Sequence, residues 1–170
     1  MLKTRRSFTQ FALILSTLIV GCNSWALEAP TERPILTISG KVVEKNAGDK
    51  ARLDMKMIAA LPQHTFTTST PWYNQPIKFT GPLLRDVLAA VKASGTTINA
   101  VAINDYKITI PMADATRFPL IVARLINDKE MAVRDKGPLF VVYPFDSSPE
   151  LRSSTYYERS IWQLKALEVQ

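Results

Sequence analysis

Short β-branched segments, separated by turn-forming residues, recur from residue 35 to the end of the chain and limit the folds open to it. Such segments predict strands, because Val, Ile and Thr fit a pleated sheet, while Pro, Gly and Asn-Asp between them predict turns. Strands are expected over residues 35–43, 64–70, 77–79, 98–103, 107–110, 120–126, 139–143 and 161–169. The chain is therefore expected to be rich in β-structure.

Helical patterns are fewer and shorter. Asp54 can cap a helix that carries apolar residues at helical spacing and ends at Pro62. Gly81-Pro82 is expected to break the preceding strand and to open the clearest helix, which should end at Gly95. Residues 113–117 predict a third helix. Many strands with a few short helices predict one α+β domain with a mixed β-sheet core.

The first 26 residues have the organisation of an export signal. Residues 3–6 carry three positive charges and precede an apolar core, and no acidic residue occurs before Glu28. Two processing sites remain open, which are cleavage after Ala26 and a lipobox that would leave Cys22 as a lipid-bearing N-terminus. Arg5-Arg6 resembles part of a twin-arginine motif, so Sec and Tat export both remain open. The mature protein is expected in the periplasm.

Residues 27–34 are expected to form an extended arm, and residues 35–170 the folded domain. The whole chain has a formal charge of +6, and removing the signal leaves +3, scattered along the sequence. The aromatic residues do not alternate with any Lys or Arg cluster, which argues against nucleic-acid binding. Cys22 is the only cysteine, so the domain has no internal disulfide and no thiolate metal cluster. Packing alone has to hold the fold.

The sequence offers little for catalysis. His64 is the only histidine, and no serine stands in a Gly-x-Ser-x-Gly elbow, so a nucleophilic triad is not indicated. The chain has six glycines and no Gly-rich phosphate loop. One histidine with scattered carboxylates does not give the spacing of a metal site. On the residues alone, binding is favoured over catalysis, and no catalytic or metal-ligating residue is expected.

Aromatic and polar side chains gather in the predicted loops. They are Trp72, Tyr73, Asn104, Asp105, Tyr106, Tyr143, Asp146, Tyr156, Tyr157, Glu158 and Arg159. Flat side chains together with a carboxylate suit a planar heterocycle, whose ring stacks while an amidine-like edge pairs with the acid. Each ring that stacks contributes about 1–3 kcal/mol, and a charge-assisted hydrogen bond about 1.5–3 kcal/mol. These loops could therefore hold a small ligand.

Several of these residues also have a purely structural interpretation. Trp162 lies in an alternating strand, which favours a core position. Tyr143 ends an apolar strand and Asp105 stands in a turn, so both remain open between structure and ligand contact. His64 is expected to be a solvated side chain. Trp72 follows a proline in a polar loop and is the strongest functional candidate, because an exposed indole needs a reason.

Several short motifs follow one another along the domain. They are Leu61-Pro62, Thr65-Phe66-Thr67-Thr68, Trp72, Phe79-Thr80-Gly81, Leu84-Arg85-Asp86-Val87-Leu88, Asn104-Asp105-Tyr106, Asp135-Lys136-Gly137-Pro138-Leu139 and Trp162-Gln163-Leu164. In order and spacing the series resembles the oxidoreductase molybdopterin-binding domain of the sulfite oxidase superfamily. The resemblance covers about residues 35–170 and implies the sulfite-oxidase-like fold.

The sequence departs from that family at the metal. The resemblance implies that the family's enzymes hold molybdenum through one cysteine in the segment that corresponds to Thr65–Ser69. Here the only side chains of this segment that could act as ligands are hydroxyls. A neutral hydroxyl is a poor replacement for a soft thiolate. Near the end, Arg159-Ser160-Ile161 stands where many of the enzymes have a lysine before the tryptophan. Molybdenum is therefore not expected, and the alternative is an oxidoreductase with a non-cysteine metal ligand.

The chain resembles more closely a cysteine-less, exported branch of the family, the periplasmic pterin-binding regulators of the PruR type. This resemblance implies a protein that senses a pterin and regulates a membrane partner, either a diguanylate cyclase/phosphodiesterase or a sensor kinase. The candidate pterin-binding residues are Thr68, Ser69, Trp72, Tyr73, Asn104, Asp105, Tyr106, Tyr143, Glu158 and Arg159.

Residue chemistry gives these candidates their expected roles. Trp72 or Tyr73 would stack on the ring, and Asp105 or Glu158 would pair with its aminopyrimidinone edge. The hydroxyl and amide side chains would surround the ring and its tail, and Arg159 would neutralise the carboxylate or face the partner. The segment from His64 to Asn74 is expected to form one wall of the pocket.

Overall fold

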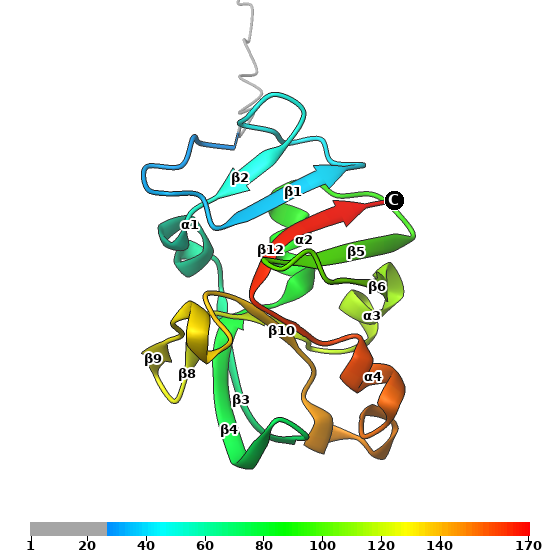
Figure 1. Cartoon of the computed structure of the whole chain (residues 1–170). Helices are drawn as coiled ribbons and strands as arrows, with labels where there is room; N and C mark the ends of the chain where they lie inside the picture. The colour runs from blue at the N-terminus through cyan, green and yellow to red at the C-terminus, as the bar shows by residue number, and fades with distance from the viewer. Residues whose placement is uncertain (1–26) are drawn as a thin grey trace, which may run out of the picture.

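The computed structural model describes residues 27–170, which fold into three β-sheets with short helices (Figure 1). The predicted signal, its two processing sites and the twin-arginine motif lie outside the described residues. Residues 27–34 contain no helix or strand. The backbone amides of Thr31 and Glu32 donate to Asp54 Oδ2 at 2.8 and 2.9 Å, which attaches this arm to the domain. Within the described part of the chain, no helix has the length and apolarity needed to cross a membrane.

The largest sheet joins the first strand of the domain to the last. Its strand order is β2 (Ala51–Leu53), β1 (Leu36–Gly40), β12 (Leu164–Val169), β5 (Thr97–Ala102) and β6 (Lys107–Pro111). β1 and β12 are parallel, with Ile38 opposite Leu167, and every other pair in this sheet is antiparallel. The sheet occupies the upper part of Figure 1.

Two smaller sheets form the rest of the domain. One has the order β3 (Gln63–Thr70), β4 (Tyr73–Pro82), β8 (Leu125–Ile126) and β9 (Lys129–Glu130), and the other the order β11 (Ile161–Trp162), β10 (Phe140–Val142) and β7 (Ile121–Ala123). The long β3–β4 hairpin extends to the lower end of the molecule in Figure 1. Mixed sheets with few short helices confirm the α+β prediction.

The helices are all short. They are α1 (Met55–Ala60), α2 (Leu84–Ala90), α3 (Met112–Arg117) and α4 (Ser154–Glu158), with 3₁₀ turns η1 (Val133–Asp135), η2 (Phe145–Ser147) and η3 (Pro149–Leu151). Asp54 caps α1 as predicted, because its Oδ1 accepts from the Met57 amide at 2.8 Å. α2 ends earlier than predicted, and the left-handed residue that follows it is Lys92 (φ 48°) rather than Gly95.

Two strand predictions were wrong in detail. Gly81-Pro82 does not break its strand, because β4 continues through Pro82. A Cβ on Gly81 would lie 2.1 Å from the Val122 carbonyl oxygen, so only glycine lets β4 pass this close to β7. The segment 120–126 is not one strand: it divides at Arg124, after which the chain leaves the β10 sheet and pairs with β4.

The last part of the chain also differs from the prediction. The polar stretch after Pro144 contains η2, η3 and α4, which composition had not indicated. The predicted strand 161–169 is divided into β11 and β12 by Gln163, whose backbone is left-handed (φ 52°). Consequently Trp162 belongs to a different sheet from Leu164.

The core runs between the sheets and reaches the lower end of the domain. Its largest fully buried side chains include Phe79, Phe140, Tyr143 and Phe145. The rings of Phe79 on β4 and Phe140 on β10 meet edge to face at 5.7 Å, which joins the two smaller sheets. This aromatic core forms the floor on which the candidate site is built.

Candidate functional site

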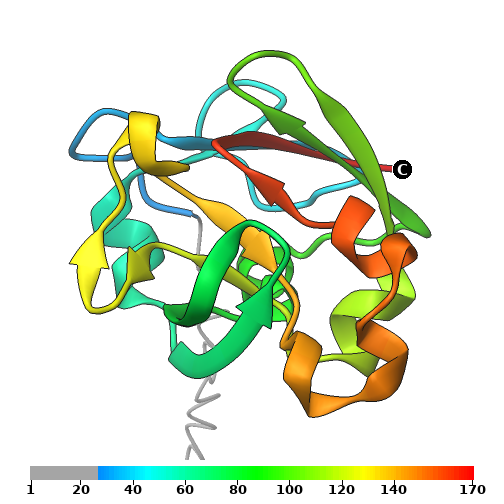
Figure 2. The same cartoon turned by 60° about the horizontal axis from the view of Figure 1, so that its bottom comes forward.

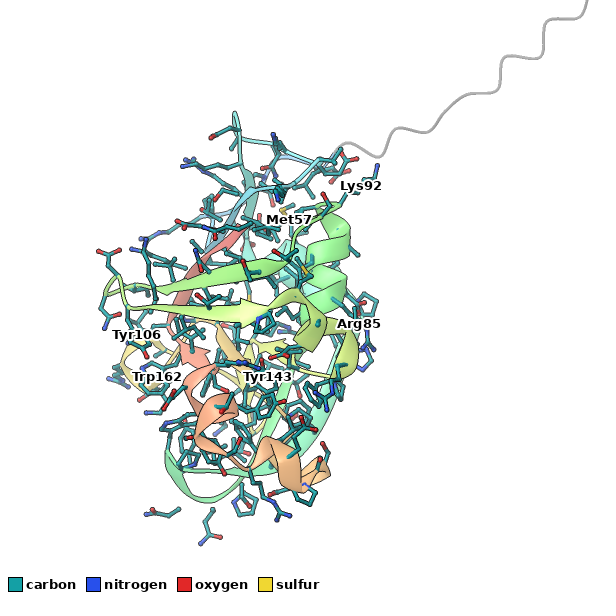
Figure 3. All side chains as sticks on the ribbon, turned by 90° about the vertical axis from the view of Figure 1, so that its right-hand side faces the viewer. Met57, Arg85, Lys92, Tyr106, Tyr143 and Trp162 are labelled. Atoms are coloured by element: carbon teal, nitrogen blue, oxygen red, sulfur yellow. The ribbon has the colours of Figure 1, made fainter. Side chains whose placement is uncertain are left out.

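A cavity of about 410 Å³ opens where the end of the β3–β4 hairpin, the β5–β6 turn, α4 and β11 come together. Its walls are formed by Trp72, Ala102, Asn104, Tyr106, Tyr157, Glu158, Ser160, Ile161 and Trp162. Figure 2, in which this end comes forward, shows the hairpin beside the segment from η2 to α4. Figure 3 shows Tyr106 and Trp162 toward the same side of the molecule, whereas Tyr143 is fully buried.

Trp72 connects the cavity to the aromatic core. It stands in the turn between β3 and β4, where its ring lies 5.5 Å from Phe140 and 6.0 Å from Phe145. Its ring also lies 5.5 Å from Trp162 and 6.3 Å from Tyr157, two further walls of the cavity. The Trp72 and Trp162 planes differ by 71°, so a flat molecule can stack on one ring and meet the other edge on.

The β5–β6 turn contributes Asn104 and Tyr106 to the cavity but not Asp105. Asn104 Oδ1 accepts from the Tyr106 amide at 3.2 Å, and Asp105 takes the left-handed conformation (φ 65°). The exposed Asp105 carboxylate instead accepts from Lys165 Nζ at 2.6 Å. This hydrogen bond and the positive charge of Lys165 lower the pKa of Asp105. Glu158 is therefore the carboxylate that lines the cavity.

A second cavity of about 390 Å³ adjoins the first and shares Tyr106 and Glu158 with it. Its other lining residues are Ile108, Thr109, Thr155 and Arg159. The two cavities together offer an aromatic compartment and a polar one on either side of the same carboxylate. A ligand with a flat ring and a polar substituent would match this division.

Arg159 forms an ion pair with the buried carboxylate of Asp114. Its Nη1 donates to Asp114 Oδ2 at 2.9 Å, and the hydroxyl of Tyr143 donates to the same oxygen at 2.8 Å. Burial, together with the hydrogen bond to the Asp114 carboxylate, raises the pKa of the Tyr143 hydroxyl. Tyr143 is fully buried and lines neither cavity. Its connection to Arg159 runs through the Asp114 oxygen to which both side chains donate.

The hydroxyl segment of β3 lies outside both cavities. Thr68 is 1% exposed, and its Oγ1 accepts from the Asp146 amide at 3.0 Å, while the Ser69 amide donates to Asp146 Oδ2 at 2.6 Å. Among residues 27–170, no three His, Cys, Asp or Glu side chains gather in a way that could hold a metal ion. The donor set of this segment therefore does not fit the thiolate-held metal that the family resemblance implies.

The ten sequence candidates fall into two groups. Trp72, Asn104, Tyr106 and Glu158 line the larger cavity and Arg159 the second, whereas Thr68, Ser69, Tyr73, Asp105 and Tyr143 line neither. Tyr73 is half-buried, and the Lys136 ammonium lies 5.5 Å from its ring and 5.1 Å from that of Trp162. Burial, followed by the negative charge of Asp135, raises the pKa of Tyr73.

The ten candidates leave out several residues of the two cavities. They are Ala102, Tyr157, Ser160, Ile161 and Trp162 in the first and Ile108, Thr109 and Thr155 in the second. The core position expected for Trp162 was wrong, because its side chain is 36% exposed and forms a wall. Tyr157 is among the aromatic residues of the predicted loops but not among the ten candidates, although its neighbour Glu158 is, and consecutive residues of one helical turn can border the same cavity.

Comparison with known proteins gives the fold and no closer relationship. No protein-family profile matches the chain, and no curated protein matches it. Comparison with solved structures shows that the chain has the sulfite-oxidase-like fold. It is similar to the sulfane dehydrogenase SoxCD from Paracoccus pantotrophus, with a TM-score of 0.59 and 16% sequence identity. The match covers 79% of this chain and 37% of the SoxCD chain, so this chain spans well under half of that protein.

Proposed function

We propose that this domain binds a pterin in the larger cavity and acts as a ligand sensor rather than as an oxidoreductase. The observation that carries the proposal is the composition of that cavity. The rings of Trp72, Tyr157 and Trp162 surround it, and the Glu158 carboxylate stands among them. These are the groups that a flat heterocycle with hydrogen-bond donors along one edge requires.

Each part of a pterin has a counterpart in the site. The ring would stack on Trp72 or Trp162, and its amino and ring N–H groups would donate to Glu158. Stacking on one indole contributes about 1–3 kcal/mol, and a hydrogen bond to a charged acceptor about 1.5–3 kcal/mol. The substituent of the ring would extend past Tyr106 into the second cavity, where Thr109, Thr155 and Arg159 supply polar groups.

The fold supports a pterin more than it supports the metal. The enzymes that this sequence resembles bind molybdenum through a pterin, so the fold is suited to this ring system. The segment that would supply the metal ligand offers only hydroxyl groups as side-chain donors. The Thr68 hydroxyl accepts from the Asp146 amide, and the Ser69 backbone amide donates to the Asp146 carboxylate. We therefore propose a site that takes the organic ring without molybdenum chemistry.

The proposed setting is the periplasm, with export by the N-terminal signal. The proposed partner is the periplasmic part of a membrane-bound diguanylate cyclase/phosphodiesterase or sensor kinase. A pterin can alter such a partner only if the loaded and empty forms bind it with different affinities. In this proposal the difference arises at the exposed rim of the cavity, which includes Tyr106 and Trp162.

The proposal is tested on protein purified from periplasm. Metal analysis is expected to find molybdenum far below one atom per chain. Calorimetric titration with 7,8-dihydrobiopterin and tetrahydrobiopterin should show saturable binding by at least one of them, weakened tenfold or more in Glu158→Gln. The matched control is Asp128→Ala, which removes an exposed carboxylate paired with Lys78 on the far β8–β9 hairpin.

Two outcomes would overturn the proposal, and a third would remove one residue from the site. Stoichiometric molybdenum with turnover of an electron acceptor would favour the oxidoreductase alternative. If native mass spectrometry finds no bound small molecule and neither reduced pterin binds, the results would favour a ligand-free adaptor protein. Equal affinity of wild-type protein and Glu158→Gln would remove Glu158 from the site.

Localisation and partner need separate measurements. The intact mass of the mature protein should correspond to a chain that begins at Leu27, whereas a lipid-modified Cys22 would contradict cleavage after Ala26. In a pull-down with the periplasmic domain of a membrane cyclase encoded by a neighbouring reading frame, the amount of bound partner should change when the reduced pterin is added. An identical pull-down with and without pterin would contradict the sensing role.

A further inference from the structure

Asp146, which lies outside both cavities, joins η2 to the end of β3 by two hydrogen bonds. Its carboxylate Oδ2 accepts from the Ser69 amide at 2.6 Å, and its own amide donates to Thr68 Oγ1 at 3.0 Å. We call this pair of bonds the Asp146 clamp. The two bonds run in opposite directions between the same two segments, so they fix both the distance and the orientation of η2 and β3.

The clamp acts where the β3–β4 ladder is irregular. Thr68 pairs with Ile77 and Thr70 with Tyr73, so Ser69 lies opposite the three residues 74–76 of β4 and has no partner in the ladder. The extra residues are on β4, and an irregularity of this kind leaves residues unpaired and bends the hairpin locally. The Asp146 carboxylate supplies the acceptor that the ladder does not give to the Ser69 amide. Thr68 is buried beside it, so the second bond is sheltered from water.

The clamp also sets the geometry of the cavity walls. Trp72 follows three residues after Ser69, and Phe145 directly precedes Asp146. The Trp72 and Phe145 rings lie 6.0 Å apart, and Phe145 lies 4.8 Å from Tyr157. Holding η2 against the hairpin therefore holds Trp72 opposite Tyr157, and both residues line the larger cavity.

We propose that Asp146 is a positioning residue for the larger cavity: through its clamp it fixes the hairpin end, so that Trp72 forms a wall and ligand affinity depends on a carboxylate outside the site. This inference rests on the proposed function, since the ligand whose affinity it affects is the pterin. It assigns to the hydroxyl segment of β3 a part in the site that involves no contact with the ligand.

The test compares three changes at the clamp. Asp146→Ala and Thr68→Val each remove one bond and should weaken binding of the pterin that wild-type protein takes up, either 7,8-dihydrobiopterin or tetrahydrobiopterin, tenfold or more. Thr68→Ser keeps the acceptor oxygen and should bind within about twofold of wild type, because the hydrogen bond is preserved. Asp128→Ala serves as the control, since Asp128 pairs with Lys78 away from the hairpin end and should leave affinity unchanged.

Two measurements on ligand-free protein report the clamp directly. Exchange of the Ser69 amide, followed by NMR, should accelerate in Asp146→Ala and Thr68→Val and stay slow in Thr68→Ser. Removing residues 1–26 leaves Trp72 and Trp162 as the only tryptophans, and both line the cavity. Their emission should shift to longer wavelength when the hairpin end is released.

The outcomes separate this inference from the proposed function. Wild-type affinity in Asp146→Ala and Thr68→Val would overturn the positioning role while leaving the pterin site intact. Failure of wild-type protein to bind either pterin would overturn the proposed function, and unchanged Ser69 exchange and emission in the variants would overturn the clamp as well. If Asp146→Ala fails to fold, Thr68→Val against Thr68→Ser decides the question.

Discussion

Trp72 contacts four aromatic rings and is the residue on which the proposed ligand site depends most. Trp72→Ala is expected to weaken binding of a reduced pterin by a factor of ten or more, because about 1.4 kcal/mol of stacking is lost. Isothermal titration calorimetry measures the change. The neighbouring variant Tyr73→Ala should leave the affinity within about twofold, since Tyr73 lines neither cavity.

Either of two results would contradict that assignment. An unchanged affinity in Trp72→Ala would remove the indole from the site. Equal losses in Trp72→Ala and Tyr73→Ala would mean that the hairpin end matters as a whole and that the two aromatic side chains are not distinguished by the cavity.

Arg159 and Asp114 form the partly buried ion pair under the second cavity. Arg159→Met keeps the length of the side chain but leaves the Asp114 carboxylate with the Tyr143 hydroxyl as its remaining donor among the described residues. The free energy of unfolding is expected to fall by about 2 kcal/mol, as for the loss of a hydrogen bond to a charged group. Urea unfolding measures it.

The double variant Asp114→Asn/Arg159→Met is the control for this pair. The double variant removes the buried Asp114 charge together with Arg159. Its free energy of unfolding should therefore be higher than that of Arg159→Met alone. A single variant as stable as wild type would show that the ion pair contributes nothing to the fold.

The role of a single residue could be predicted from sequence only where that role does not depend on contacts with distant parts of the chain. Trp72 was found because an indole in a polar loop needs a contact wherever the loop goes. Asp105 could equally have faced a ligand, and only the fold brings Lys165 within 2.6 Å of it. Trp162 was misplaced because an alternating pattern assumes one continuous strand, and the left-handed Gln163 interrupts it.

The capping of α1 gives a prediction for the behaviour of the fold in acid. Backbone hydrogen bonds from Met57, Glu32 and Thr31, of which the first has the largest effect, hold the pKa of Asp54 below its ordinary value of 3.8. A carboxyl with a lowered pKa stabilises the folded state above its unfolded value and loses this effect as the pH falls through the folded pKa. Wild-type protein should therefore lose stability below pH 3.8 relative to Asp54→Asn, which does not titrate.

Urea unfolding at a series of pH values tests this prediction. The stability difference between wild type and Asp54→Asn should be largest near neutrality and should shrink below pH 3.8. Asp54→Ser keeps a capping oxygen without a charge and should follow Asp54→Asn. A constant difference across the whole range would contradict the role of the carboxylate.

Elements were predicted best where local chemistry decides them. Asp54 and Pro62 marked α1 because capping and termination are local effects. α4 was missed because its five residues, Ser154–Glu158, are mostly polar and too few to form a stable helix alone. Contacts distant in sequence hold it, among them the pairing of Arg159 with Asp114. The division of residues 120–126 into β7 and β8 likewise depends on two different partner strands.

The position of β12 predicts that the domain does not fold without this strand. β12 lies between β1 and β5 at the centre of the largest sheet, so a chain truncated after Gln163 would lose the strand that joins them. The truncated protein is expected to be unfolded by circular dichroism. Removing Gln170 alone should leave the domain folded at a lower stability, because β12 ends at Val169 and only the hydrogen bonds of the Gln170 backbone with Thr96 and Thr97 are lost. A folded, soluble chain without residues 164–170 would contradict this.

At the scale of the whole molecule, fold class was predictable and sheet order was not. Short strands with few helices indicate an α+β domain from local pattern alone. Nothing local pairs β1 with β12, since Ile38 and Leu167 meet only after every intervening element has taken its place. The cavities could not be predicted either, because their walls come from three separate segments of the chain.

The pairing of the domain's first strand with its last has a temporal consequence. β1 is synthesised early, but its partner strand β12 (Leu164–Val169) is synthesised last. During synthesis the largest sheet therefore lacks its central strand. Contacts between segments so distant in sequence also form slowly. The largest sheet can therefore be completed only after nearly the whole domain has been synthesised, because its central strand is the last one of the chain.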